Sequence, residues 1–292
     1  MATPPIFIVG VQRSGTTFLR LIFNRHPEIS IPFESNFLDV ISAAVELDFY
    51  DWEQKKSLME NILNEPLTQK GGITFPDMDK LREVHSPAEM ISALFDDNSR
   101  REGKTRWGVK TPHYIIKMHE ILHFFPDARI IALVRDPRGI FVSQKSISWG
   151  AKQPSKLAYF WNMAIQSVEM IETLFPNNIR VVRYCDLITD TEEVVKSLCG
   201  FAQCDFVPEM LDFDNHKSVL PKDSVEWHKN SVRRPDPRKV EEWREKLSPF
   251  DNATFVHLCG EGLKRFGYEA IKPSFNLPQK VLKRLRSAIY YS

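Results

Sequence analysis

The sequence has few of the residue patterns that identify metal centres or disulfide scaffolds. It contains four cysteines in 292 residues, and they form no CxxC pair and no His-rich metal-ligand spacing: Cys185, Cys199, Cys204 and Cys259. Small disulfide-stapled domains are far richer in cysteine. We therefore expect free thiols and no metal site.

An excess of charge of one sign is also missing. The 39 Lys and Arg residues nearly balance 38 Asp and Glu residues, so the net charge is +1. Such a chain has no general attraction to nucleic acid or to an acidic membrane, and any anion site must come from particular residues. No basic leader or long apolar run precedes the first apolar segment, so we expect a cytoplasmic protein without a signal peptide or transmembrane segment.

No low-complexity linker divides the chain. Hydrophobic residues make up 42% of the sequence and aromatic residues 11%, which is enough for one large α/β core. We expect a single domain over residues 1–292.

The stretch from Ile6 to Arg20 reads IFIVGVQRSGTTFLR. An apolar β-branched run, a glycine-bounded turn and a helical pattern follow one another, which predicts strand, loop and helix. Gly10 and Gly15 bracket four residues, which is the spacing of a P-loop, whose backbone N–H groups hold a phosphate at the positive end of the next helix.

This loop departs from the loops that bind ATP or GTP. Thr16 and Thr17 occupy the positions of the usual Lys and Ser or Thr, and the cation, Arg13, lies before the second glycine. Loops of ATP and GTP sites use the lysine on the β and γ phosphates and the hydroxyl on Mg²⁺. A guanidinium with two hydroxyls suits a nucleotide whose terminal group needs no metal.

The RSGTT loop resembles the 5′-phosphosulfate-binding loop of sulfotransferases that use 3′-phosphoadenosine 5′-phosphosulfate (PAPS). On this motif alone, an ordinary strand-to-helix turn is the alternative. The resemblance implies nucleotide contacts by Gln12, Arg13, Ser14, Gly15, Thr16 and Thr17.

A glutamate follows the next short strand. Ile29 to Ile31 predicts that strand, and Glu34 then lies at its carboxyl end, where open parallel sheets bind ligands. From the pattern, a carboxylate in the first turn of the following helix is equally plausible. Tyrosylprotein sulfotransferases share the order RSGTT, helix, His-Pro, short strand and Glu, and the resemblance implies that Glu34 is the catalytic base.

Residues 36–106 read as helices and loops. We expect helices over Phe37–Leu47, Trp52–Leu63 and Pro87–Phe95, forming a lid or an acceptor wall.

The segment from Trp107 to Tyr114 reads WGVKTPHY, a strand that ends in a polar turn. It resembles the Lys-Thr-Pro segment of glycan sulfotransferases, which implies that Lys110 holds the sulfonate and the leaving phosphate. A solvated lysine at the strand end is the alternative. His113 lies one residue beyond the histidine base of cytosolic sulfotransferases, because Pro112 occupies that position, so we expect a structural or acceptor-contacting histidine.

A second motif lies in ARIIALVRDPRGIFVSQK, from Ala128 to Lys145. Its apolar run predicts a buried parallel strand, with Arg135 at the carboxyl end and Ser143 two helical turns further on. This resembles the arginine and serine that bind the 3′-phosphate of PAPS in sulfotransferases.

Two further nucleotide contacts follow from the resemblance. Tyr184 ends a third strand, Ile179 to Tyr184, and is placed against the adenine, although a core tyrosine fits equally well. Arg233 lies in a basic run before a helix containing Trp243 and corresponds to a cationic closing residue, although a solvated charge run is the alternative.

We also expect a C-terminal helix over Pro278–Ser292. Its basic residues accompany an apolar stripe, which is typical of a packed helix with a wet basic face; a membrane surface or a partner is the alternative.

Together these features predict a single P-loop-type α/β domain with a parallel sheet of about five strands flanked by helices. The resemblance implies a PAPS-dependent sulfotransferase with Glu34, Lys110 and Arg13 as catalytic residues and no metal. The acceptor hydroxyl, on tyrosine, glycan, lipid or a small molecule, would contact Phe33, Trp107, His113 and Trp149. The alternatives are a P-loop kinase of a small metabolite or nucleoside, and a catalytically silent nucleotide-binding scaffold.

Overall fold

The computed structural model describes residues 3–44, 47–145, 147–213, 221 and 231–271. Its strands are β1 (Ile6–Gly10), β2 (Ile29–Ser30), β3 (Arg106–Lys110), β4 (Arg129–Val134) and β5 (Ile179–Arg183). Its helices up to β4 are α1 (Thr16–Asn24), α2 (Phe37–Ser42), α3 (Trp52–Asn64), α4 (Pro66–Lys70), η1 (Met78–Glu83), α5 (Pro87–Arg101), η2 (Pro112–Ile116) and α6 (Met118–Phe124). Those after β4 are α7 (Pro137–Lys145), α8 (Pro154–Leu174), α9 (Tyr184–Thr189), α10 (Thr191–Ala202), η3 (Pro208–Leu211), α11 (Arg238–Glu241), α12 (Trp243–Lys246) and α13 (Pro249–Arg265).

The five strands form one parallel sheet in the order β2-β3-β1-β4-β5, which confirms the predicted fold class. The central strand β1 is buried along its whole length. Its run of apolar residues is explained by this position, because a central parallel strand is covered on both faces.

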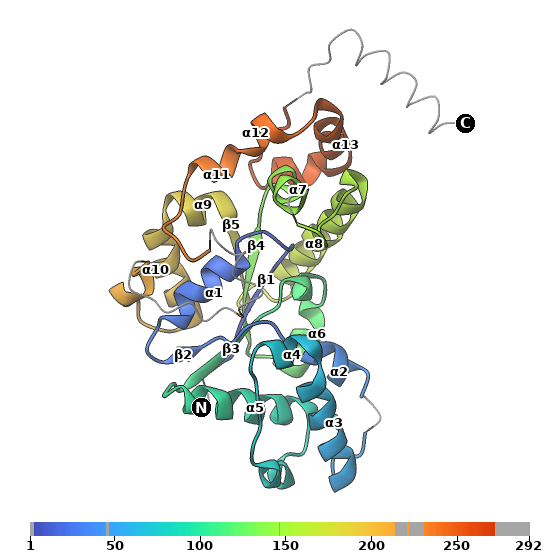
Figure 1. Cartoon of the computed structure of the whole chain (residues 1–292), viewed down its shortest axis with the longest axis vertical. Helices are drawn as coiled ribbons and strands as arrows, with labels where there is room; N and C mark the ends of the chain where they lie inside the picture. The colour runs from blue at the N-terminus through green and yellow to red at the C-terminus, as the bar shows by residue number, and fades with distance from the viewer. Residues whose placement is uncertain (1–2, 45–46, 146, 214–220, 222–230, 272–292) are drawn as a thin grey trace, which may run out of the picture.

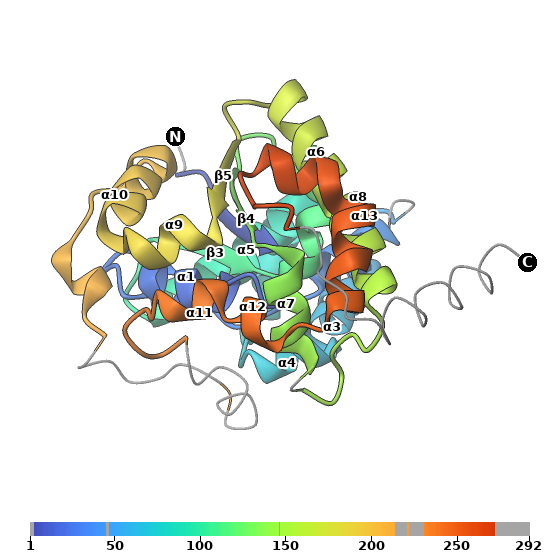
Figure 2. The same ribbon diagram turned by 90° about the horizontal axis from the view of Figure 1, so that it is seen from above.

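Helices cover both faces of the sheet (Figures 1 and 2). Helices α1, α9 and α10 lie on one side, and α6, α8 and α13 lie on the other. Successive side chains of β1 alternate between the two cores: Ile8 packs with Leu19 and Leu133, whereas Phe7 belongs to the larger core around Trp161.

The chain leaves β1 and β4 in opposite directions along the sheet. After β1 it passes through α1 to the edge strand β2, and after β4 it passes through α7 and α8 to the other edge strand, β5. The carboxyl ends of β1 and β4 therefore form a topological switch point, which is where open α/β sheets bind ligands. This topology brings the glycine-bounded loop close to the RDPR turn.

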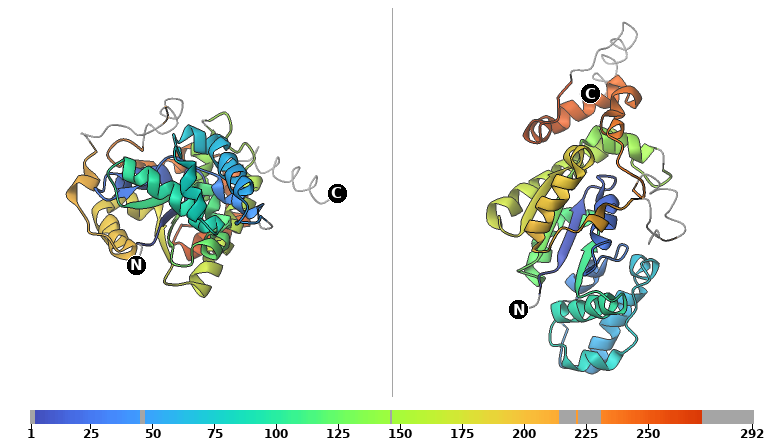
Figure 3. Two further views of the ribbon diagram at one scale, coloured as in Figure 1. Left: turned by 90° about the horizontal axis from the view of Figure 1, so that it is seen from below. Right: turned by 90° about the vertical axis from the view of Figure 1, so that its left-hand side faces the viewer.

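The helical segment between β2 and β3 gathers at one end of the molecule, as Figure 3 shows. Phe37, Leu58 and Phe95 join the same core as Phe7, so the segment is packed onto the sheet core. Helix α5 extends to Arg101, beyond the predicted end, because Asn98 and Arg101 donate hydrogen bonds to the backbone carbonyl of Thr74.

Tyr184 begins α9 instead of ending β5, because Asp186 in the first helical turn pairs with Arg183 and favours a helix start there. The helix expected over Pro278–Ser292 lies outside the described residues. Within the described ranges, no helix has the length and apolar character needed to cross a membrane.

Candidate active site

A cleft of about 1460 Å³ opens at the carboxyl edge of the sheet. Its wall is built from the loop after β1, the segment after β2, helix α4, the turn after β4, the start of α9, and helices α11 and α12. The topological switch point therefore opens into a cleft large enough for a nucleotide and part of a second substrate.

The loop after β1 has a left-handed backbone at two positions. Arg13 has a φ of 77° and Gly15 a φ of 97°. A Cβ atom at Gly15 would lie 2.8 Å from Cδ2 of Tyr184, so both the backbone conformation and the contact require glycine. The loop ends at Thr16, the first residue of α1, and exposes the positive end of that helix to the cleft.

Ser14 is fully buried, and no described residue hydrogen-bonds to its Oγ atom. Buried hydroxyl groups are nearly always paired. An unpaired hydroxyl in a glycine-bounded loop fits a ligand oxygen, as a phosphate group would supply. The loop residues are therefore compatible with a bound nucleotide phosphate.

Two arginines and a serine connect this loop to the turn after β4. Nε of Arg13 donates to Oγ of Ser143 over 3.1 Å, and Nη1 of Arg135 donates to the carbonyl of Arg13 over 2.7 Å. The guanidinium of Arg135 lies 4.1 Å from the ring centroid of Tyr184. Burial and the neighbouring charge of Arg135 both lower the pKa of Arg13, and a bound anion would offset both effects.

Glu34 and Lys110 form an ion pair beside the loop. The ammonium group of the fully buried Lys110 donates to the carboxylate of Glu34, and Nζ also lies 3.5 Å from Oγ1 of Thr17. Burial lowers the pKa of Lys110, whereas the charge of Glu34 and its hydrogen bond raise it. The carboxylate lines the cleft with 17% of its side chain exposed, and the lysine lies behind it.

The segment carrying Glu34 is anchored on both sides. The fully buried Arg20 donates to the carbonyl of Ile31 over 2.8 Å, and burial lowers the pKa of Arg20 to about 10. On the other side, Oγ1 of Thr111 donates to the carbonyl of Ser35 over 2.8 Å. These bonds hold the short loop after β2 against α1 and β3.

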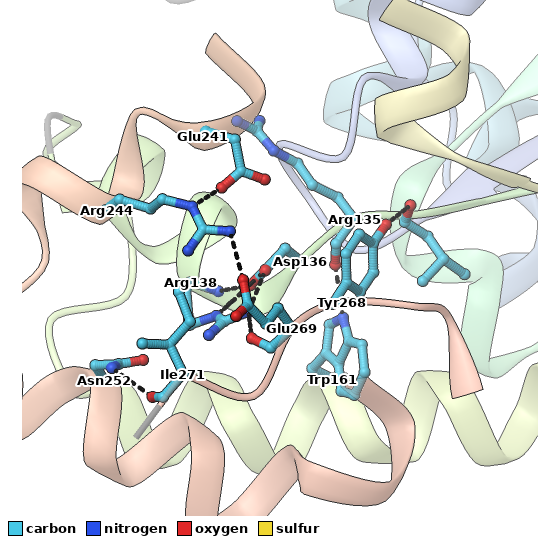
Figure 4. Close-up of polar contacts among 11 residues, drawn as sticks. Arg135, Asp136, Arg138, Trp161, Glu241, Arg244, Asn252, Tyr268, Glu269 and Ile271 are labelled. Atoms are coloured by element: carbon cyan, nitrogen blue, oxygen red, sulfur yellow. Dashed lines mark hydrogen bonds and ion pairs between the residues drawn. The ribbon is translucent and has the colours of Figure 1, made fainter. Parts of the chain in front are cut away.

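A network behind the cleft supports the end of β4 (Figure 4). The indole N–H of Trp161 donates to the carbonyl of Arg135 over 2.9 Å, and the hydroxyl of Tyr268 donates to the carbonyl of Val134 over 3.0 Å. The buried Arg138 pairs with Asp136 over 2.7 Å. The C-terminal part of the described chain thereby fixes the strand end that carries Arg135.

The structure brings most of the expected site residues together. The cleft wall contains Gln12, Arg13, Gly15, Thr16, Thr17, Phe33, Glu34, Arg135, Ser143, Trp149, Tyr184 and Arg233. Ser14 and Lys110 are buried and do not line the cleft; Lys110 lies directly behind Glu34.

Trp107 does not reach the cleft, which corrects the expectation of an acceptor contact. Its ring stacks on Phe95 with centroids 5.3 Å apart and packs in the larger core. Side chains alternate along a strand, so Trp107 and Lys110 point to opposite faces of β3. That alternation could have excluded Trp107 from the sequence alone.

His113 also lies outside the cleft wall. Its Nε2 atom is 3.5 Å from a carboxylate oxygen of Asp39 in α2, and its ring packs edge-on against Tyr114. The neighbouring Pro112 lines the cleft instead. This geometry favours the structural interpretation of His113 over acceptor contact.

Sequence reasoning missed several residues of the cleft. Leu67 and Lys70 enter it from α4. Trp243, in the helix that the sequence places after the basic run, enters it from α12. No local motif marks the first two, because their position depends on how the helical segment packs. No three His, Cys, Asp or Glu side chains gather as a metal site in the part of the chain that the structure describes.

Residues 4–208 match the model of a protein family described as the sulfotransferase family. Among curated proteins, the chain is 24% identical to Protein-tyrosine sulfotransferase 1 of Danio rerio, over 96% of this chain and 77% of that protein. It is 26% identical to Protein-tyrosine sulfotransferase of Drosophila melanogaster over 80% of this chain. An uncharacterized protein of Aquifex aeolicus is 23% identical over 89% of this chain. The chain spans 45% of the Drosophila protein and 33% of the Aquifex protein.

Solved structures share the fold. The sulfotransferase domain of the Synechococcus olefin synthase superimposes with a TM-score of 0.63 at 21% identity, covering 92% of this chain and 96% of that one. A mouse sulfotransferase complexed with PAP, which is adenosine 3′,5′-bisphosphate, gives a TM-score of 0.51 at 14% identity, with coverages of 91% and 90%. At these identities the likeness concerns the fold.

Proposed function

The chain belongs to the sulfotransferase family, and from this premise we propose that it transfers a sulfonate group from PAPS to the hydroxyl group of an acceptor. One observation carries the proposal: the Glu34 carboxylate lines the same cleft as the phosphate loop, and the buried Lys110 contacts both Glu34 and Thr17 of α1. A proton acceptor and a cation thus lie beside an anion-binding loop.

The nucleotide would lie across the switch point. The backbone amides of the loop, Ser14 and Arg13 bind the 5′-phosphosulfate, and Arg135 with Ser143 binds the 3′-phosphate. The like-charged pair of Arg13 and Arg135, whose proximity lowers the pKa of Arg13, supports a doubly anionic ligand at this place. Tyr184 and Arg233, both in the cleft wall, complete the proposed nucleotide contacts.

PAPS supplies a sulfonyl group attached to a phosphate leaving group. Glu34 accepts the proton of the acceptor hydroxyl on its carboxylate, and it is held for this by the anchored loop after β2. Lys110 and Arg13 stabilise negative charge that develops on the phosphate oxygen at the loop. Phe33 and Trp149 contact the acceptor from the cleft wall.

The acceptor is defined here only as a hydroxyl group. The relatives from Drosophila melanogaster and Danio rerio carry the name protein-tyrosine sulfotransferase, so tyrosine in a peptide is the first acceptor to test, before glycan, lipid and small-molecule hydroxyls. A cytoplasmic location stays a prediction from the sequence.

The test has two stages. Calorimetry on the full chain compares adenosine 3′,5′-bisphosphate with ATP plus Mg²⁺, and we expect the bisphosphate to bind tightly and ATP weakly. Labelled PAPS is then offered with pooled acceptors, and transfer of label separates an enzyme from a silent scaffold. Tight Mg²⁺-dependent binding of ATP without binding of the bisphosphate would refute the proposal.

A further inference from the structure

Trp243 contributes a buried hydrogen-bond donor to the cleft. Its side chain is 4% exposed and lines the cleft wall, yet no acceptor for its indole Nε1–H exists among the residues that the structure describes. Buried N–H groups are rarely left without an acceptor. A donor in this state at the wall of a binding cleft indicates that a ligand supplies the acceptor.

A second buried donor lies close to it. Arg135 uses Nη1 on the carbonyl of Arg13, but its Nε–H has no acceptor within the described ranges. Gly139 lies between the two side chains: a Cβ atom there would be 3.2 Å from Nε of Arg135 and 3.6 Å from Cδ1 of Trp243, the carbon bonded to Nε1. Arg135 and Trp243 therefore both lie against Gly139, in the first turn of α7, where a side chain would crowd the guanidinium of Arg135.

The indole is held in this position by a buried cation. The guanidinium of Arg138 lies 3.8 Å from the Trp243 ring centroid, and Arg138 itself pairs with Asp136 and donates to the carbonyl of Glu269 over 2.8 Å. This cation–π contact fixes the ring without using its N–H group. The N–H therefore remains available at the cleft.

The charges around the two donors favour an anion. Asp136 pairs with Arg138, and two further carboxylates of the cleft also have cationic partners: Glu242 with Lys239 and Lys246, and Asp236 with Arg238. The positive end of α7 lies at the same place. An anionic oxygen would form strong hydrogen bonds with both donors, because the charge of Arg135 strengthens its bond. A neutral adenine nitrogen would be stabilised much less by that charge.

We propose that Trp243 is a nucleotide-binding residue, whose indole N–H donates together with Nε–H of Arg135 to the oxygens of one phosphate group above Gly139. The inference rests on the proposed function, in which this group is the 3′-phosphate of PAPS. Gly139 has no side chain and so lets Arg135 and Trp243 lie close to α7, and Arg138 is a positioning residue for the indole.

The test is Trp243→Phe, which keeps an aromatic ring on Arg138 and removes only the donor. Calorimetry on the full chain measures adenosine 3′,5′-bisphosphate and adenosine 5′-phosphate. We expect the Kd of the bisphosphate to rise about tenfold to 150-fold, the scale of one hydrogen bond to a charged group, with the Kd of the monophosphate unchanged. Trp52→Phe, the same change in α3 away from the cleft, is the matched control and should alter neither value.

Two results would overturn the inference: an unchanged Kd for the bisphosphate, or equal losses for both ligands. Failure of the wild-type chain to bind the bisphosphate at all would instead refute the proposed function. If Trp243→Phe melts at a lower temperature, the comparison of the two ligands still decides: a loss confined to the bisphosphate supports the inference, and an equal loss for both rejects it.

Discussion

The buried ammonium group of Lys110 donates a hydrogen bond to the carboxylate of Glu34, across the ends of the neighbouring strands β3 and β2. The lysine side chain is fully buried and the carboxylate faces the cleft, so Lys110 and Glu34 form their ion pair at the boundary between the core and the cleft. A substitution of Glu34 therefore changes the pKa of Lys110 as well as removing the carboxylate from the cleft.

Glu34→Gln tests the proposed base. The amide keeps the size and one acceptor oxygen, so the fold and nucleotide binding should survive, whereas kcat should fall by roughly 10² to 10⁴, the contribution of a positioned base. The measurement is steady-state turnover with one acceptor, together with calorimetry for the nucleotide.

His113→Ala is the companion variant. His113 pairs with Asp39 outside the cleft wall, so kcat should stay within a few-fold of the wild type and any effect should appear in KM for the acceptor. Near-normal turnover in Glu34→Gln together with a collapse in His113→Ala would transfer the role of base to the histidine.

The parts of the site that the sequence predicts are those that local pattern determines. The apolar runs of β1 and β4 are buried on both faces, so they were recognisable as parallel strands, and Arg135 follows directly from its place at a strand end. Glu34 follows from its place at the carboxyl end of a short strand, and in the structure β2 is parallel to β3 and ends at the same edge of the sheet.

The remaining parts depend on contacts between distant segments. Lys70 reaches the cleft because α4 packs beside the loop after β2, and Trp243 reaches it because Arg138 is stacked on its ring. The packing of α4 has no local signal, whereas the basic run before α12 marks the segment of Trp243. Trp107 lies in the core instead of the cleft because it is on the face of β3 opposite to Lys110.

Arg135→Ala should weaken the binding of adenosine 3′,5′-bisphosphate by about 2 to 4 kcal/mol, the scale for a charged contact left without its partner. The binding of adenosine 5′-phosphate should change much less. Arg129→Ala is the matched control, because Arg129 lies at the opposite end of the same strand and donates to the carbonyl of Asn177. Calorimetry on both ligands checks the prediction. Equal losses for the two nucleotides would show that Arg135 does not bind the 3′-phosphate.

Removal of divalent metal should leave nucleotide binding and turnover intact. Thr16 stands where ATP and GTP loops carry the lysine that acts together with Mg²⁺. The measurement is bisphosphate binding and sulfonate transfer before and after dialysis against EDTA. A strict requirement for Mg²⁺ would restore the kinase alternative.

The last prediction concerns the alkaline limb of nucleotide binding. Burial lowers the pKa of Lys110 below its usual 10.5, and the lysine is charged only below its own pKa. Affinity for the bisphosphate should therefore begin to fall at a lower pH than it would if the lysine were exposed to solvent. In Glu34→Gln the carboxylate that raises this pKa is gone, so the limb should move further toward neutral pH. Binding constants measured across the alkaline range in both proteins check this, with Lys110→Met as the variant that should lack the limb. A limb that stays in place in Glu34→Gln, or persists in Lys110→Met, would show that another group controls it.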